Sequence, residues 1–360
     1  MRSSRKIGIV SWDFDPPKGG LGRTLIHMAE VLRKQGYDVR TLTPSGGTDV
    51  IGGWTKRGGF HLAFSAVLFF CLHRWIRHTK REIVCFPCGP GGVWLLKKPK
   101  ACTTVAIVYH TYTQQIRLVP GQWWKRAFLP LERISLRKAD AIFCYATDTR
   151  DVLVHAYGCK PDCVHLLPQL LDLHPWLVAQ GEKEPGLCVC VARMEQRKGI
   201  RFLAVLWPHV KKLCPSAKLI VVGEGIQEGR IDRLVAQEHL SVQRIPSLPL
   251  RDLIALVRRA ELVLCPSYLE GFGLTALEAM AAGTPLLASG TDGLRSLIRH
   301  GETGFLLPVA DLPAWLHAVQ ELLSHPEEGT RVAAAARTEV QRRFAAEASI
   351  RALQELLEAL

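Results

Sequence analysis

Short apolar runs recur along the chain, and longer segments with helical periodicity separate them. The runs lie at residues 6–12, 38–43, 82–86, 101–109, 139–145, 187–192, 217–222, 261–265 and 285–288. Runs of this length, followed by turn residues, are typical of the buried strands of a parallel sheet. Their alternation with helical segments predicts an α/β fold with doubly wound sheets.

The segments between the runs repeat apolar residues every three or four positions. One begins at about Arg23, repeats Leu25, Met28 and Leu32, and stops at Gly36. We expect further helices at residues 60–81, 149–156, 200–213, 274–282, 312–323 and 332–360, and a loop at residues 291–296.

Polar, turn-rich segments at residues 167–175 and 180–186 interrupt this pattern. A chain of 360 residues that is 48% hydrophobic is long enough to bury two cores. We therefore expect a first Rossmann-like domain over residues 1–170, a linker over residues 171–185, and a second Rossmann-like domain over residues 186–342.

The net charge of +13 lies entirely in the first half. Residues 1–170 carry 25 Lys and Arg against 11 Asp and Glu, whereas residues 171–360 carry 21 against 22. This asymmetry indicates an anionic partner, which could be membrane phospholipid, a phosphorylated acceptor or nucleic acid. A basic surface that merely keeps the protein soluble is the alternative.

Two aromatic and basic segments lie in this half. Trp75 stands in the basic end of the helix expected at residues 60–81, and Trp123 and Trp124 precede Lys125 and Arg126. Such segments suit the surface of an anionic membrane. A solvated helix end and tryptophans packed in the core are the alternatives.

The expected location is the cytoplasm, with peripheral contact to the cytoplasmic membrane. No signal peptide is expected, because the basic N-terminus passes straight into a strand, and the apolar window at residues 60–72 is too short to span a bilayer. Eleven scattered cysteines suit a reducing compartment. Cys85 and Cys88 have the spacing of a redox or metal pair, but their place in a strand and its loop favours unreactive thiols.

A glycine loop links the strand expected at residues 261–265 to the helix expected at residues 274–282. Such a joint presents free backbone N–H groups to an anion. Glu270 before the loop and Glu278 on the helix can accept hydrogen bonds from sugar and ribose hydroxyls. These features predict a nucleotide-sugar site; an ordinary strand–helix joint with two solvated glutamates is the alternative.

Other candidate residues follow other predicted strands. Arg193 and Lys198 flank a loop where two cations could clamp a diphosphate, and Gly223 opens a loop expected near the nucleotide base. His110 ends a strand of the first half, at the sheet edge where α/β proteins bind ligands. The alternatives are an ordinary surface loop and a structural histidine.

The combined motifs resemble the signature of the retaining GT-B glycosyltransferases of family 4. The resemblance covers the stretch from Glu270 to Glu278, residues 283–285 and 300–305, and an Arg-x4-Lys-Gly pattern from Arg193 to Gly199. It implies two Rossmann-like domains facing an interdomain cleft, with the last helix, about residues 343–360, packed back on the first domain. Departures at residues 169–170, 245–246 and 292–296 leave the linker geometry and the choice of nucleotide open.

The resemblance also implies the roles of individual residues. The expected catalytic residues are His110, Arg193, Lys198 and Glu270. The expected donor-binding residues are Gly19, Gly20, Arg193, Lys198, Gly223, Glu270, Gly271, Phe272, Gly273, Leu274 and Glu278. The reaction is expected to need no metal ion or cofactor.

The expected function is sugar transfer from a nucleotide-diphosphate sugar to a hydroxyl of a glycan or lipid-linked acceptor, with retention of anomeric configuration. The expected setting is the synthesis of cell-surface polysaccharide, lipopolysaccharide or glycolipid. A nucleotide-sugar epimerase or hydrolase of GT-B fold is one alternative, and a noncatalytic nucleotide-sugar or lipid-binding protein is another. Nucleic acid is not expected as a partner, because no nucleic-acid-binding motif accompanies the charge.

Overall fold

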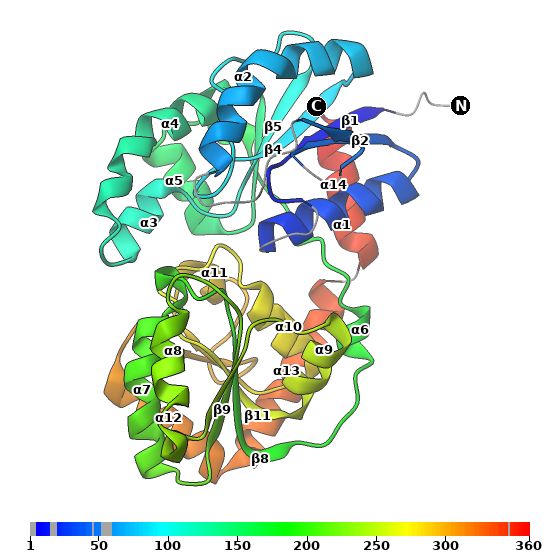
Figure 1. Ribbon diagram of the computed structural model, residues 1–360. Coiled ribbons are helices and arrows are strands. Elements are labelled where there is room, and N and C mark those ends of the chain that lie inside the picture. The colour runs from blue at the N-terminus through cyan, green and yellow to red at the C-terminus, as the bar shows by residue number, and fades with distance from the viewer. Residues whose placement is uncertain (1–4, 15–19, 45–46, 52–59, 345) are drawn as a thin grey trace. The chain divides into compact units, whose positions relative to one another are not determined.

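The computed structural model describes residues 5–14, 20–44, 47–51, 60–344 and 346–360. The chain divides into two compact units (Figure 1). The first comprises Met1–Arg117, Gly121–Leu171 and Ala346–Leu360, and the second comprises Leu118–Pro120 and Asp172–Ala345.

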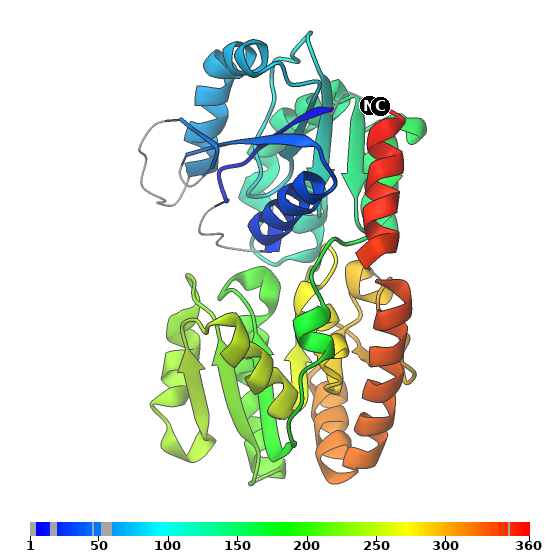
Figure 2. The same cartoon turned by 90° about the vertical axis from the view of Figure 1, so that its right-hand side faces the viewer.

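The first unit is built on a parallel sheet with the strand order β3-β2-β1-β4-β5-β6-β7. The strands are β1 (Lys6–Val10), β2 (Asp38–Thr43), β3 (Asp49–Val50), β4 (Ile83–Pro87), β5 (Thr103–Val108), β6 (Ala141–Cys144) and β7 (Val164–Leu166). The helices are α1 (Gly20–Lys34), α2 (Phe60–Thr79), α3 (Tyr112–Leu118), α4 (Leu129–Lys138), α5 (Thr147–His155) and α14 (Ala346–Glu358), with 3-10 turns η1 (Trp123–Phe128) and η2 (Pro161–Cys163). Helices α1 and α14 lie on one face of the sheet, and α2, α4 and α5 lie on the other (Figures 1 and 2).

The second unit is also built on a parallel sheet, with the order β10-β9-β8-β11-β12-β13. Its strands are β8 (Glu184–Val191), β9 (Lys218–Val222), β10 (Val242–Ile245), β11 (Ala260–Cys265), β12 (Leu286–Ser289) and β13 (Phe305–Leu307). Its helices are α6 (His174–Leu177), α7 (Ile200–Leu213), α8 (Glu228–Val235), α9 (Leu250–Arg259), α10 (Leu274–Ala282), α11 (Asp292–Arg295), α12 (Leu312–Ser324) and α13 (Pro326–Arg343), with 3-10 turns η3 (Gln196–Lys198) and η4 (Glu238–Leu240). Helices α7, α8 and α12 cover one face, and α9, α10 and α13 cover the other (Figure 1).

The α/β fold with doubly wound sheets is confirmed, and β2 and α10 have the predicted bounds. Three expectations need correction. Residues 291–296 are not a plain loop, because α11 forms within them; the segment expected as a linker contains α6 and the start of β8; and residues 332–360 form two helices. No helix in the described part of the chain is long and apolar enough to cross a membrane.

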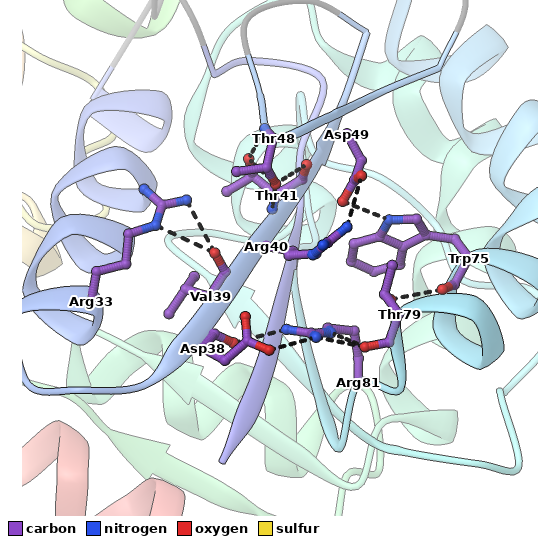
Figure 3. Close-up of polar contacts among 10 residues, drawn as sticks. All are labelled: Arg33, Asp38, Val39, Arg40, Thr41, Thr48, Asp49, Trp75, Thr79 and Arg81. Atoms are coloured by element: carbon purple, nitrogen blue, oxygen red, sulfur yellow. Dashed lines mark hydrogen bonds and ion pairs between the residues drawn. The ribbon is translucent and has the colours of Figure 1, made fainter. Parts of the chain in front are cut away.

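Buried polar contacts fasten one end of α2 to β2 and β3 (Figure 3). The Arg81 side chain is 3% exposed, and its guanidinium donates to the Asp38 carbonyl, the Asp38 carboxylate and the Thr79 carbonyl, each at 2.8 Å. The hydrogen bond from Arg81 keeps the pKa of Asp38 below its usual value. The Trp75 indole donates to Asp49 at 3.1 Å. Trp75 is thus half-buried and engaged within the fold, and its expected membrane contact stays a prediction.

Replacing Arg81 by Met should destabilise the first unit strongly. The two carbonyls and the carboxylate lose their donor, so the free energy of unfolding should fall by about 2–4 kcal/mol in urea denaturation. Arg40→Met is the matched control, because Arg40 pairs with Asp49 at 3.4 Å on the surface. That variant should cost less than about 1 kcal/mol. Equal losses would contradict the role given to Arg81.

Candidate active site

Two loops lie side by side at the C-terminal edge of the second sheet. One joins β8 to α7 through η3, the other joins β11 to α10, and β8 and β11 are neighbouring parallel strands. Gly199, after η3, has φ +72°, and a Cβ atom there would lie 1.8 Å from the Pro266 carbonyl oxygen. Only glycine therefore permits this approach of the two loops. A hydrogen bond of 2.8 Å from the Tyr268 N–H to the Arg197 carbonyl links them further.

The approach of the loops brings Lys198 to Glu270. The Lys198 ammonium donates to Glu270 Oε1 at 2.5 Å, and the Ser267 hydroxyl donates to the same oxygen at 2.7 Å. Arg197 Nη1 lies 4.0 Å from the other carboxylate oxygen. Two residues expected to bind different parts of a donor are thus paired with each other.

The Glu270 carboxylate stays ionised despite its burial. Burial alone would raise its pKa, but Lys198, Arg197 and the hydrogen bond from Ser267 outweigh that effect and place the pKa below its usual value. Glu270 and Glu278 are 7% and 2% exposed, so the alternative of two solvated glutamates is wrong.

A second carboxylate links the cations of the first loop. Glu195 pairs with Arg193 at 2.9 Å and with Arg197 at 3.1 Å. Burial would raise the pKa of Glu195, but Arg197, Arg193 and Lys198 keep it below its usual value. Arg193 is 44% exposed and Arg197 only 11%, so Arg193 is the one open to a ligand.

Helix α10 begins directly after the glycine loop. Gly271, Phe272 and Gly273 form the turn, Leu274 is the first helical residue, and no side chain caps this end of the helix. The first backbone N–H groups of such a helix have no intrahelical acceptor and carry partial positive charge. Glu278 lies in the second turn of α10, the helix that follows the glycine loop.

Further predicted residues occupy the corresponding edges of the two sheets. Gly223 follows β9, beside the end of β8. In the first unit Gly20 begins α1 after β1, and the half-buried His110 follows β5. Gly19 lies outside the described residues. All these strands are parallel, so Gly20 and His110 lie at the C-terminal edge of their own sheet.

The two cysteines of the Cys-x-x-Cys pair lie where their thiols are unreactive. Cys85 and Cys88 are buried and free, and burial raises the pKa of Cys85 to about 12 and that of Cys88 above its usual value. Both therefore remain thiols at neutral pH. Within the described ranges no three His, Cys, Asp or Glu side chains are grouped as metal ligands would be.

An open hollow of about 720 Å³ lies at the opposite, N-terminal edge of the first sheet. Lys98 and Asp140 line it and pair with each other, and Asp140 also accepts from the Thr104 N–H and hydroxyl, both at 2.9 Å. Two of its charged groups, Lys98 and Asp140, thus bind each other, and the glycine loops lie at the other edge. The candidate site is therefore the Lys198–Glu270 region.

The sequence missed three polar residues of this region, namely Glu195, Arg197 and Ser267. Arg197 and Ser267 stand within three positions of a predicted residue, but nothing in their spacing shows that they contact Glu270. The arrangement places the exposed Arg193, the largely buried Lys198–Glu270 pair and the start of α10 at one edge of the second sheet.

Comparisons with known proteins show which proteins this chain resembles. The family model described as "Glycosyltransferase Family 4" matches residues 18–174, and "Glycosyl transferases group 1" matches residues 178–339. Glycogen synthase of Mycobacterium tuberculosis is 26% identical over 376 residues, covering 92% of this chain and 89% of the relative. Phosphatidyl-myo-inositol mannosyltransferase of Mycobacterium leprae is 26% identical over 364 residues, covering 94% and 92%.

A solved structure of similar fold carries a nucleotide sugar. The Anabaena protein Alr3699/HepE in complex with UDP-glucose matches with a TM-score of 0.75 at 17% identity, covering 99% of this chain and all of that one. At this identity the likeness shows the fold.

Replacing Ser267 by Ala should destabilise the second unit. The buried Glu270 carboxylate loses a hydrogen bond, which should lower the free energy of unfolding by about 1.5–3 kcal/mol in urea denaturation. Ser289→Ala is the control, because Ser289 is equally buried and its hydroxyl bonds to no described residue. That change should be near neutral. If Ser267→Ala were also neutral, Glu270 would not depend on this hydroxyl.

Proposed function

The chain belongs to the group 1, family 4 glycosyltransferases and has the GT-B fold, and on this premise we propose that it transfers a sugar from a nucleotide-diphosphate sugar to a hydroxyl of a glycan or lipid-linked acceptor. We further propose that the anomeric configuration is retained and that the reaction serves the synthesis of cell-surface polysaccharide, lipopolysaccharide or glycolipid. The observation that carries the proposal is the Lys198–Glu270 pair beside the start of α10.

The chemistry of the leaving group supports this assignment. Breaking the anomeric bond leaves negative charge on the departing diphosphate. Arg193, Lys198 and the N–H groups at Phe272–Leu274 would stabilise that charge most strongly in the transition state. These protein cations supply the role that a metal ion would otherwise fill, so we propose a reaction without one.

The carboxylates suit the neutral parts of the donor. Lys198 and Ser267 occupy one oxygen of Glu270, and the other oxygen remains to accept from a sugar hydroxyl. Glu278 would accept from the ribose, and Gly223 would lie near the base. From the first unit, Gly19, Gly20 and His110 would contribute to the donor phosphate and the transferred sugar.

The relatives support the two acceptor classes. One is named for glycogen and the other for phosphatidyl-myo-inositol, a phospholipid. A lipid-linked acceptor would require the enzyme to work at a membrane surface. We therefore extend the proposal to peripheral contact with an anionic membrane.

Exposed aromatic side chains on neighbouring elements support this membrane contact. Phe70 on α2 is 81% exposed and Trp123 in η1 is 71% exposed. The two elements are neighbours, because the backbone N–H of the buried Trp94 donates to the Ser65 hydroxyl oxygen of α2 at 3.1 Å, and the Trp94 ring stacks on Phe128 of η1 at 5.6 Å. Trp123 and Trp124 are both exposed, so the alternative that they pack in the core is wrong. The exposed basic residues in or directly after these two elements are Arg74, Arg77, Lys80 and Arg126.

Donor binding is tested by thermal unfolding with UDP, GDP and ADP sugars and free nucleotides in EDTA. One nucleotide series should raise the Tm by about 5–10 °C at concentrations near a hundred times its Kd. Glu278→Gln should weaken that ligand about ten- to hundredfold, because a ribose hydroxyl loses a charged acceptor. Glu321→Gln, an exposed change on α12, should leave the shift intact. No shift with any nucleotide would contradict the proposal.

Retention is tested by NMR with the nucleotide sugar that binds. When no acceptor is added, slow hydrolysis of an α-linked donor should release the α anomer first. Appearance of the β anomer first would contradict retention. Hydrolysis that no added glycan or lipid acceptor suppresses would instead support the hydrolase alternative.

Membrane contact is tested by sedimentation with vesicles of 70% phosphatidylcholine and 30% phosphatidylglycerol. The protein should bind at low salt and be released at high salt, since each basic residue near the surface contributes about 1 kcal/mol. The double change Phe70→Ser and Trp123→Ser should reduce binding about tenfold or more. Val205→Ser, an exposed apolar residue of the second unit, is the control. Equal binding of both variants would contradict this surface.

A further inference from the structure

In the first unit, a buried carboxylate lies next to the backbone segment that carries His110. Glu132 on α4 has no exposed surface, and both of its oxygens lie 3.1 Å from the Tyr112 backbone nitrogen. The Tyr157 hydroxyl donates to Oε2. The groups that lower the pKa of Glu132 are the Tyr157 hydroxyl and the Tyr112 N–H. Both of these hydrogen-bond donors are neutral.

Further hydrogen bonds hold the segment that carries His110. The Thr149 hydroxyl donates to the Tyr109 carbonyl at 3.3 Å, and the Thr111 N–H donates to Gln114 Oε1 at 2.9 Å. Glu132 accepts the next N–H, that of Tyr112. A Cβ atom at Gly89 would lie 2.5 Å from the His110 carbonyl oxygen and 3.6 Å from Glu132 Oε1. The His110 peptide is therefore packed closely against Gly89, beside the carboxylate that accepts the Tyr112 N–H.

Stability alone does not account for a carboxylate at this place. Burial raises the pKa of Glu132 to about 7, even though Tyr157 and the Tyr112 N–H lower it. The folded protein therefore binds this proton more tightly than the unfolded chain, whose carboxyl has a pKa near 4.5. Stability consequently falls as the pH rises from about 4.5 to 7, and the charged form is the costly one. A glutamine would fill the same space without that cost.

The other titratable groups around Glu132 are neutral at this pH. Burial raises the pKa of Cys159 to about 11 and raises those of Cys88, Tyr112 and Tyr157 above their usual values. The nearby cations contact Tyr157 rather than the carboxylate: Arg133 lies over its ring and Arg137 donates to its carbonyl. Compared with these thiols and phenols, Glu132 is the group whose pKa lies near 7.

We propose that Glu132 is a positioning residue for sugar transfer, which in its ionised form anchors the Tyr112 N–H and thereby orients His110. The inference rests on the proposed function, in which His110 contacts the transferred sugar. Protonation of the carboxylate leaves it a weaker acceptor for its two donors, so the His110 segment loses its fixed orientation. Glu132 itself touches no substrate.

The decisive variant is Glu132→Gln, which keeps the shape and removes the charge. We expect kcat to fall about ten- to hundredfold, as misplacement of a reacting group does. Nucleotide affinity should change less than about twofold, because most of the proposed nucleotide contacts lie in the second unit and Glu132 contacts none of the others. The wild-type rate should decline as the pH falls through about 7, and the variant should lose this limb of the profile. Its Tm at pH 8 should equal or exceed that of the wild type.

Tyr157→Phe provides the matched comparison, because it removes one donor and leaves the carboxylate. Its acid limb should move to higher pH, since the ionised form loses a stabilising bond. An unchanged kcat and pH profile in Glu132→Gln would overturn the inference, as would a loss explained wholly by unfolding.

A second measurement distinguishes failure of this inference from failure of the proposed function. If the wild-type protein transferred no sugar, the role of Glu132 would be read from the His110 imidazole resonance in histidine-labelled protein, assigned with His110→Gln. Glu132→Gln should shift that resonance and move its titration. An unchanged resonance would overturn the inference independently of any activity.

Discussion

The ion pair between Lys198 and Glu270 is the interaction on which the candidate site depends. Both side chains are largely buried, so either charge without the other would be strongly unfavourable. The pair can form only because Gly199 allows its loop to reach Pro266, and because β8 and β11 are neighbours in the sheet. The ionisation of one carboxylate is thus a consequence of the topology of the whole second unit.

The pKa of a buried glutamate is shifted in opposite directions in the two units. Glu270 lies among cations, which keep its pKa low, whereas the Tyr157 and Tyr112 donors to Glu132 are neutral, and burial raises its pKa to about 7. Both carboxylates stand next to a strand end that carries a candidate catalytic residue. The first is therefore a constant charge across the physiological range, and the second changes charge within it.

Much of the fold could be predicted, because buried parallel strands and amphipathic helices leave a direct pattern in the sequence. The bounds of α10 followed from strong helix formers between Gly273 and Gly283. The partners of Glu270 could not be predicted, since Ser267 and Arg197 are ordinary polar residues until the loops meet. The hydrogen bond of Trp75 to Asp49 could not be predicted for the same reason, because the two residues lie 26 positions apart in the sequence. Local pattern gives elements, whereas pairings between elements require the folded chain.

The balance of charge around the pair explains why an anion would bind there. Arg193, Arg197 and Lys198 face two carboxylates, Glu195 and Glu270, so one positive charge is in excess. Glu195 is shared between Arg193 and Arg197, Glu270 engages Lys198, and Arg193 is the most exposed of the three cations. A diphosphate would meet a fixed, partly neutralised array rather than three mobile cations. Little reorganisation would then be required as charge develops on the leaving group.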